Sequence, residues 1–269
     1  TSLRFVVLTV GAIVMILPFA YMVSTAFKPQ AYVLETPPKF IPDPGTVDNF
    51  VQAWTTQDFS RYALNSAFVS VTSTALAVWL SSMMAYAFAR FDFPGKEWFF
   101  RALLLGLMIP SMMLIIPQFV LTKQLHLIDN LWALVLFYVS GNLALNTFLL
   151  RSFFEGIPRE LDEAMEVDGA NVWTRYWRLA MPLARPALAT TVIFTFLATW
   201  DEFAWALTVI STETKRTLPI AIQLFHGQNS TQWGLVFAAS LIAILPVIVV
   251  YLIFQRHFVA GLTAGAVKG

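Results

Sequence analysis

The densest group of charged residues lies around the stretch PRELDEAMEVDGANVWTRYWRLAMPLARP, residues 158–186. Six carboxylates fall between positions 155 and 168, while the sequence on either side is almost continuously apolar. Carboxylates at this density favour recognition of a basic partner surface, provided that no catalytic partners accompany them. The six are Glu155, Glu160, Asp162, Glu163, Glu166 and Asp168.

Catalytic partners are missing from the sequence. The three histidines, His126, His226 and His257, are scattered, the H-E-x-x-H pattern is absent, and no nucleophile–base pair is evident. The absence of cysteine excludes disulfides, thiolate catalysis and Cys-based metal sites. No G-x-x-x-x-G-K-[ST] sequence is present, so we expect no ATP site, no catalytic residue and no metal or cofactor site in this chain. The net charge of +1 also gives no nucleic-acid footprint.

The carboxylates are predicted to lie on a short helix. Pro158 suits a first helical turn, because its missing N–H would have no partner there in any residue. Asp168 and Gly169 supply the stop, because glycine tolerates the left-handed conformation that ends helices. An apolar stripe recurs at helical spacing, and the acids lie mostly away from it. The stripe consists of Ile157, Leu161, Ala164 and Met165.

A second short helix is predicted directly afterwards. Asn171 is expected to cap it, Trp173, Tyr176 and Trp177 give it an apolar face, and prolines end it at 182 and 186. The two helices would project an acidic, amphipathic surface. A solvated loop on the membrane surface is the plain alternative. The stripe needs a partner, however, and acids suit an anionic leaflet poorly, so we favour docking into a basic-rimmed protein groove.

These helices must be positioned by a membrane protein. The chain has 269 residues, is 58% hydrophobic and only 12% charged, and its mean hydropathy is +0.67. The apolar runs are continuous rather than alternating, which predicts an all-α polytopic fold with six transmembrane helices. The first run is too long for a signal peptide and is expected to be retained. The predicted spans are approximately 5–27, 63–89, 99–121, 131–150, 187–210 and 234–254.

Lysine and arginine set the orientation of these spans. With the N-terminus inside, the inner side holds 11 of them and the outer side 6, so both termini and the segment 155–186 are predicted to be cytoplasmic. The inner residues are Arg4, Arg90, Lys96, Arg101, Arg151, Arg159, Arg175, Arg178, Arg185, Arg256 and Lys268. The outer residues are Lys28, Lys39, Arg61, Lys123, Lys215 and Arg216.

The segment EAMEVDGANVWTRYWRLAMP resembles the EAA loop of permease subunits in binding-protein-dependent ABC importers. That pattern reads Glu-Ala-Ala, three residues, Gly, nine residues, Ile-x-Leu-Pro. Glu163, Ala164, Gly169 and Pro182 occupy matching positions, and the departures stay apolar: Met165 for Ala, Leu179 for Ile and Met181 for Leu. WDEFAWAL at 200–207 and QRHFVAGLTAGAVKG at the C-terminus resemble the carbohydrate-uptake type, the group of the second maltose permease subunit, with Asp201 where Asn is commoner.

The resemblance implies a multi-pass protein of a bacterial or archaeal cytoplasmic membrane. It implies a second permease subunit, giving a heterodimer, two cytoplasmic ATP-binding cassette subunits that bind ATP and Mg, and an extracytoplasmic solute-binding protein. The segment 155–186 would couple the permease to the ATPases, and residues 255–269, flexible by composition, would contact them too. The coupling residues would be Glu163, Ala164, Met165, Asp168, Gly169, Ala170 and Pro182.

The solute pathway is less legible in the sequence. Tyr138, Asn142 and Asn146 are four apart and share one helical face, which suits either interhelical hydrogen bonds or a sugar. Trp200, Asp201 and Glu202 are further candidates, and the two acids either line the pathway or bind neighbouring helices.

Other features leave alternatives open. Gln228, Asn229 and Ser230 either reach the binding protein or form a solvated loop. Pro18, Pro110, Pro117 and Pro246 either kink helices around a cavity or are ordinary prolines of membrane helices, and we favour the second. Glycerol-phosphate-type solutes are an alternative to sugars, although basic residues are few in the spans. A secondary transporter or channel is a weaker alternative, because it would need no coupling loop and the sequence shows no clear internal repeat.

Overall fold

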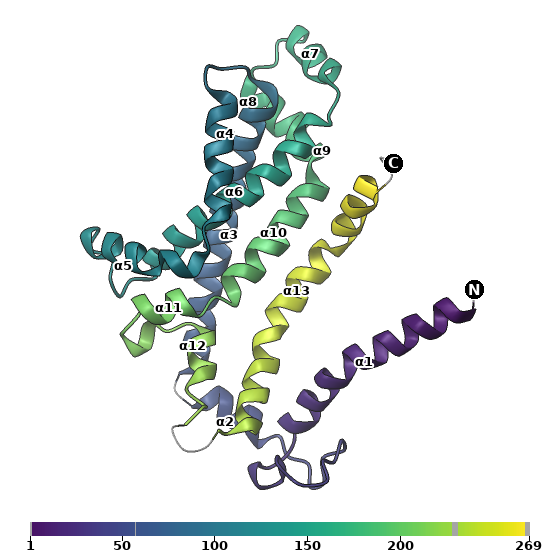
Figure 1. Cartoon of the computed structure of the whole chain (residues 1–269), viewed down its shortest axis with the longest axis vertical. Coiled ribbons are helices and arrows are strands. Elements are labelled where there is room, and N and C mark those ends of the chain that lie inside the picture. The colour runs from purple at the N-terminus through teal and green to yellow at the C-terminus, as the bar shows by residue number, and fades with distance from the viewer. Residues whose placement is uncertain (1, 57, 228–230, 267–269) are drawn as a thin grey trace. The chain divides into compact units, whose positions relative to one another are not determined.

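The computed structural model describes residues 2–56, 58–227 and 231–266, and Gln228, Asn229 and Ser230 lie outside them. Every regular element in the described ranges is helical, which confirms the all-α class (Figure 1). The long helices are α1 (Ser2–Ala26), α3 (Phe59–Arg90), α6 (Leu131–Glu155), α10 (Arg185–Trp200) and α13 (Trp233–Ala266). The short ones are α2 (Asp48–Thr55), α4 (Lys96–Leu105), α5 (Ile115–Gln124), α7 (Arg159–Val167), α8 (Val172–Arg175), α9 (Met181–Leu183), α11 (Ala204–Val209) and α12 (Leu218–Gln223).

Length and composition qualify four described helices to cross a membrane: α1, α3, α6 and α13. Two further pairs of helical segments qualify only if each bent pair counts as one span. They are Lys96–Met108 with Ser111–Gln124, and Val172–Leu183 with Arg185–Trp200. The count of six spans and the cytoplasmic location of both termini therefore stay predictions.

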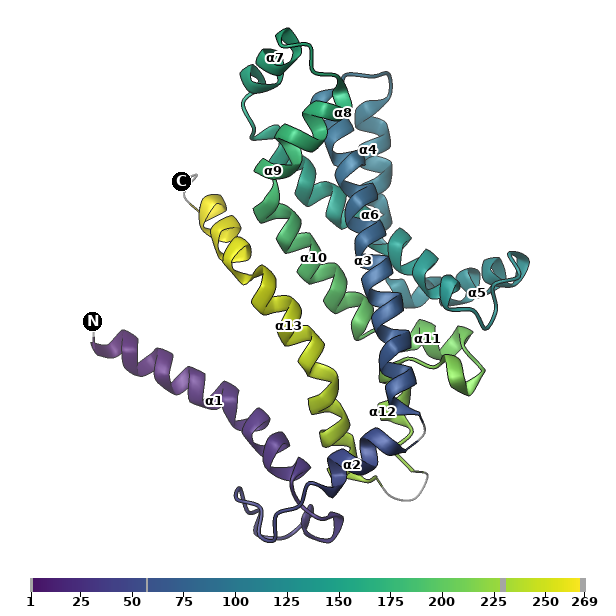
Figure 2. The same cartoon turned by 180° about the vertical axis from the view of Figure 1, so that it is seen from behind.

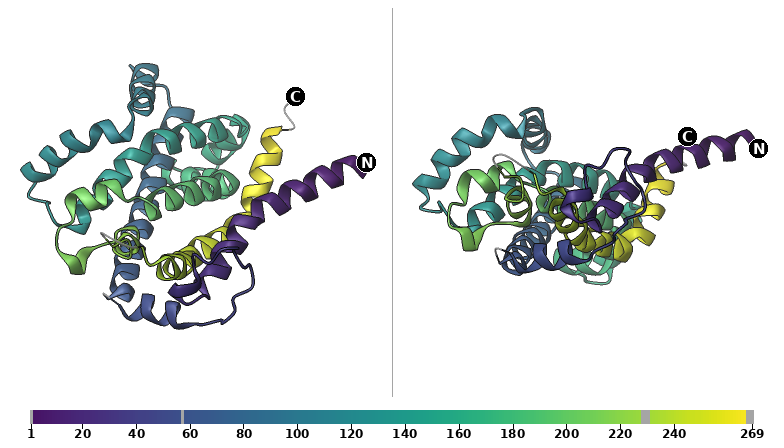
Figure 3. Two further views of the ribbon diagram at one scale, coloured as in Figure 1. Left: turned by 60° about the horizontal axis from the view of Figure 1, so that its bottom comes forward. Right: turned by 90° about the horizontal axis from the view of Figure 1, so that it is seen from below.

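The third predicted span, 99–121, is not a continuous helix. Two 3₁₀ turns, Gly106–Met108 and Ser111–Leu114, separate α4 from α5, and the two halves meet at 94°. The cause lies at Pro110, because a proline disfavours the helical conformation of the residue before it. Ile109 is accordingly extended, with φ −91° and ψ 117°. Figure 3 shows from two more directions how α5 turns away from α4.

The fifth predicted span, 187–210, is also interrupted. The helix α10 ends at Trp200 and α11 starts only at Ala204. At the other end, α10 meets the preceding helical piece, Val172–Leu183, at 78°. The helix α13 continues past the predicted end of the sixth span at 254, because its backbone is helical to Ala266.

Residues 1–65 and 216–246 form one compact unit. The buried amide of Asn49 fixes the end of α1 there, since its Nδ2 donates to the carbonyls of Ala26 at 2.8 Å and Lys28 at 2.7 Å. Gly234, in the first turn of α13, lies against the same amide, and a Cβ at this position would approach Asn49 Nδ2 to 2.8 Å. Only glycine allows this contact between α13 and Asn49.

Residues 66–215 and 247–269 form the other unit, in which α6 and α10 run side by side (Figures 1 and 2) and α3 packs against α6. Much of the buried face of α3 consists of small residues, which let membrane helices approach closely. Ser81 Oγ lies 3.4 Å from the Leu143 carbonyl of α6, and Asn146 Nδ2 donates to Thr195 Oγ1 of α10 at 2.8 Å. The small buried residues of α3 include Ser70, Ser73, Ala77, Ser81, Ser82 and Ala85.

A carboxylate clamp joins the loop before α6 to the loop after α11 in the same unit. Asp129, with φ 59°, accepts hydrogen bonds from the Ser211 and Thr212 amides at 3.0 and 2.9 Å and from Thr212 Oγ1 at 2.6 Å. Lys215 Nζ lies 3.0 Å from its Oδ2. Burial opposes ionisation, but the hydrogen bonds from Thr212, Lys215 and Ser211 outweigh it and hold the pKa of Asp129 well below its usual range.

Candidate coupling site and solute pathway

The predicted acidic helix is α7, and it ends as the sequence indicates. Gly169 has φ +80°, a conformation that glycine adopts without strain. Its amide donates to the Glu166 carbonyl at 2.9 Å, and the Ala170 amide donates to the Met165 carbonyl at 2.9 Å. This pair of bonds is a Schellman motif, which satisfies the last carbonyls of a helix. The stop predicted at Asp168 and Gly169 is confirmed.

The faces of α7 differ from the prediction. Ile157 is buried before the helix starts, Met165 is half-buried, and Leu161 and Ala164 are exposed, so these four residues form no common stripe. The helix instead turns Asp162 toward the rest of the chain. Its outer face is the exposed set Glu160, Leu161, Ala164, Val167 and Asp168, in which the Val167 side chain is 89% exposed.

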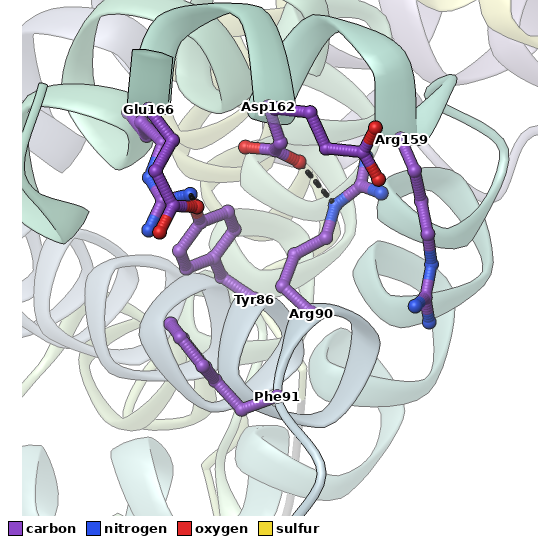
Figure 4. A pocket seen from close by; sticks show the side chains of 8 residues that line it. Tyr86, Arg90, Phe91, Arg159, Asp162 and Glu166 are labelled. Atoms are coloured by element: carbon purple, nitrogen blue, oxygen red, sulfur yellow. Dashed lines mark hydrogen bonds and ion pairs between the residues drawn. The ribbon is translucent and has the colours of Figure 1, made fainter. Parts of the chain in front are cut away.

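Arginines of the same chain explain why acids face inward. Arg90, the last residue of α3, forms an ion pair with Asp162 at 3.1 Å, and Arg175 of α8 forms one with Glu166. These side chains line a polar pocket of about 200 Å³ (Figure 4). Buried charges need partners, so the arginines determine which face of α7 is turned inward. The full lining is Tyr86, Arg90, Phe91, Arg159, Asp162, Glu163, Glu166 and Arg175.

The second helix begins as predicted and then departs from the α form. Asn171 Oδ1 accepts the Thr174 amide at 2.8 Å, which confirms the predicted cap. A π-helical turn, Tyr176–Ala180, follows α8 and leads into α9, where Pro182 lies in the first turn. Tyr176 is buried and its OH lies 2.6 Å from Ser82 Oγ of α3. The predicted apolar face is only partly covered, because Trp173 and Trp177 are 57% and 50% exposed.

An apolar cluster fixes the base of this loop. It joins the end of α3, the end of α6 and the π-helical turn, and it leaves α7 outside. The base of the loop is therefore packed against α3 and α6, and α7 lies outside this cluster on the polar pocket. The buried members are Ala85, Tyr86, Ala89, Leu150, Phe154, Ile157, Tyr176, Ala180 and Ala184.

The predicted pathway face of α6 finds hydrogen-bond partners within the protein. Asn146 is 1% exposed and binds Thr195, while Asn142 Nδ2 donates to the Tyr138 carbonyl one turn earlier at 2.8 Å. The Tyr138 hydroxyl donates to Glu202. Of the two predicted roles, Asn146 and Tyr138 therefore make hydrogen bonds to residues outside α6, whereas Asn142 makes a hydrogen bond within α6.

Glu202 holds the break between α10 and α11. Its carboxylate accepts the Trp205 amide at 2.8 Å and the Ala206 amide at 3.1 Å, which are free donors at the start of α11. Trp200 is buried and stacks on Phe196 with ring centroids 5.3 Å apart. Asp201 is exposed. The structure thus brings Tyr138 and Glu202 together and separates the roles of the two adjacent acids.

Arg90, Arg175 and Asp129 were not singled out from the sequence as site residues. The spacing of Asp162 and Glu166, one turn apart, would have been a usable signal, because two acids on one helical face favour a basic neighbour. The identity of that neighbour was not available, because Arg90 lies far away in the sequence.

Known proteins resemble this chain over almost its whole length. The sulfoquinovosyl glycerol transport system permease protein SmoH of Agrobacterium fabrum is 35% identical over 99% of this chain and 94% of its own length. The trehalose transport system permease protein SugB of Mycobacterium tuberculosis is 37% identical over 94% and 93%. The trehalose/maltose transport system permease protein MalG of Thermococcus litoralis is 34% identical over 99% and 98%.

Structural and family comparisons agree with these relatives. The fold matches a chain of a bacterial ABC transporter involved in the import of the acidic polysaccharide alginate, with a TM-score of 0.82, 24% identity and 95% coverage of both chains. The model of the binding-protein-dependent transport system inner membrane component matches residues 77–263, which include the whole of α7 and its pocket. The chain belongs to this family of inner membrane transport components.

Proposed function

We propose that this permease subunit forms half of the pathway of an ATP-driven sugar importer and that α7 couples it to the ATPases. The observation that carries the coupling role is the arrangement of α7. Two acids of its inner face form ion pairs with arginines of the same chain. Leu161, Ala164 and Val167 face outward, and nothing in the described structure covers them. An exposed helix face that carries apolar side chains suits docking in a groove of a partner protein.

Energy would reach the chain through that contact. Two ATP-binding cassette subunits would bind ATP and Mg, and their closure would displace α7 as a rigid element. The displacement would switch the pathway from inward to outward facing, so that a solute-binding protein can release its cargo. A second permease subunit would supply the other half of the pathway. The family description, which names a binding-protein-dependent system, supports this division of labour.

The proposed topology has six spans in a bacterial or archaeal inner membrane, with both termini and α7 cytoplasmic. It counts α4 with α5 as one broken span, and α10 with α11 as another. The excess of lysine and arginine on the side that includes α7 supports the orientation. In this frame the break at 201–203 lies inside the fifth span, where helix interruptions are tolerated beside a cavity.

Asp201 is the proposed contact with the solute in that break. Glu202 and Tyr138 bind each other and the start of α11, so we assign them to holding the break open. Asp201 is exposed one residue away and is free to accept hydrogen bonds from hydroxyl groups. A sugar is the proposed solute class, because the relatives named for trehalose and maltose match nearly all of this chain.

The coupling role is tested by placing a charge on the outer face of α7. Leu161→Asp and Val167→Asp should each weaken association with the ATPase subunits at least about tenfold, because burying such a side chain contributes about 1.5–3 kcal/mol. Association is measured with purified subunits in detergent. The matched control is Val51→Asp on α2. Val51 is exposed and is predicted to lie on the opposite side of the membrane from α7, so this substitution should leave association with the ATPase subunits unchanged. Unchanged association in both α7 variants would refute the role.

The substrate class is tested on the partner binding protein. Calorimetry against a panel of neutral sugars and glycerol phosphates should show binding of a sugar. The same solute should then be taken up by vesicles that contain the complete transporter and ATP. Binding of glycerol phosphates alone would overturn the sugar assignment and leave the coupling role standing.

A further inference from the structure

Arg90 binds both α7 and the residue that leads into it. Its Nη2 donates to the Ile157 carbonyl at 2.9 Å, and its Nε lies 3.1 Å from Asp162 Oδ2, as Figure 4 shows for the second contact. Ile157 directly precedes Pro158, where the chain enters α7. One planar guanidinium therefore holds the entry to α7 and its inner face at the same time.

The surroundings shield this ion pair from water. The side chains of Arg90 and Asp162 are 7% and 13% exposed. One turn earlier on α3, Tyr86 packs edge to face on Phe154 and Tyr176, with ring centroids 5.8 and 5.3 Å apart. Breaking a buried ion pair leaves charges without compensation, so α7 does not readily separate from α3.

The second attachment of α7 is weaker. Glu166 is 66% exposed in its pair with Arg175, and an exposed ion pair contributes little because water and salt screen it. We propose that Arg90 is the positioning residue that makes α7 and α3 move as one body, so that displacement of α7 is delivered to α3. This inference rests on the proposed coupling role of α7. The small-residue face of α3 would carry the motion along α6.

The test uses Arg90→Gln in the assembled transporter in vesicles. Association with the ATPases should stay within about twofold of wild type, because the outer face of α7 is intact. Uptake should fall by about tenfold, and ATP hydrolysis should continue without stimulation by the binding protein, because residues along a coupling route change coupling on this scale. Hydrogen exchange in residues 159–167 should accelerate, which reports the loosened helix directly.

Two further variants isolate the ion pair. Asp162→Asn removes the pair but leaves the Arg90 bond to Ile157, so it should uncouple in the same direction and less severely. The double variant should be no worse than Arg90→Gln alone, because both substitutions remove one shared interaction. The matched control is Arg151→Gln. The Arg151 side chain is 13% exposed and forms ion pairs with two carboxylates, and its substitution should leave uptake and the stimulation of ATP hydrolysis by the binding protein intact.

The outcomes separate this proposal from the coupling role itself. Full stimulation by the binding protein in Arg90→Gln, or additive effects in the double variant, would overturn the Arg90 proposal alone. Normal association in Leu161→Asp and Val167→Asp would overturn the coupling role of α7. If Arg90→Gln fails to assemble, Asp162→Asn decides: normal uptake in that variant counts against the proposal.

Discussion

Gly169 gives the sharpest prediction about local structure. It is the left-handed residue of the Schellman motif, with φ +80°, and a Cβ there would meet no atom within 4 Å. Substitution by alanine therefore costs only the conformational term, about 1–2 kcal/mol for an L-residue in this region. Converted at about 1.4 kcal/mol per factor of ten, this opens the end of α7 about fivefold to thirtyfold more often.

The assay is amide hydrogen exchange of residues 159–170 in the purified complex. Gly169→Ala should exchange faster by that factor, and Gly169→Asn should lie between alanine and glycine because asparagine tolerates the left-handed region. The matched control is Gly141→Ala in α6, where a Cβ also meets nothing within 4 Å but φ is not positive. There alanine should leave exchange unchanged or slow it. Equal exchange in Gly169→Ala and wild type would refute the reasoning.

Three further predictions concern hydrogen bonds. Asp129→Asn should destabilise the fold by about 1–3 kcal/mol at neutral pH, seen as a lower melting temperature in detergent. Because the folded pKa of Asp129 lies below its unfolded value, the ionised form stabilises the fold above that unfolded pKa, near 3.9, and the effect is lost as pH falls through the folded pKa. The difference in melting temperature should therefore be constant down to about pH 5 and narrow as the pH falls further, and a difference that stays constant down to about pH 3 would contradict this origin. Asn171→Ala should cost about 1 kcal/mol through loss of the cap on Thr174, measured by exchange in α8, and Asn171→Ser should restore most of it. Glu202→Gln should lower the melting temperature, because an amide cannot satisfy two backbone donors and the Tyr138 hydroxyl as a carboxylate does. Asp201→Asn should leave the melting temperature unchanged. The opposite result would contradict the assignment of Glu202 to the structure of the break and of Asp201 to solute binding.

The local features of the loop were predictable because they depend on neighbouring residues. Gly169 and Asn171 act within one turn of chain, and their conformational preferences are the same in any protein. The all-α class followed from continuous apolar runs. The break at Pro110 also has a local signal, the proline itself. Proline is common in membrane helices, however, so the sequence alone did not favour a 94° bend there.

The orientation of α7 could not be predicted, because it depends on a residue distant in sequence. Periodicity finds a helix and its faces but does not say which face meets the protein. Arg90 reverses the expectation drawn from the apolar residues, since it draws Asp162 inward and leaves Leu161 exposed. The break at Glu202 could not be predicted either, because a carboxylate in an apolar run can be a pathway residue or a helix cap and the sequence does not decide between them.

The internal pairing of the acids bears on how the loop responds to ionic strength. Glu155, Asp162 and Glu166 are each neutralised by an arginine of the same chain, so half of the six carboxylates have little charge left to offer a partner. Attraction between exposed charges fades within about 10 Å at 0.1 M salt, whereas apolar contact does not. A subunit that docks through Leu161 and Val167 should therefore survive a high-salt wash that strips peripheral proteins held by charge.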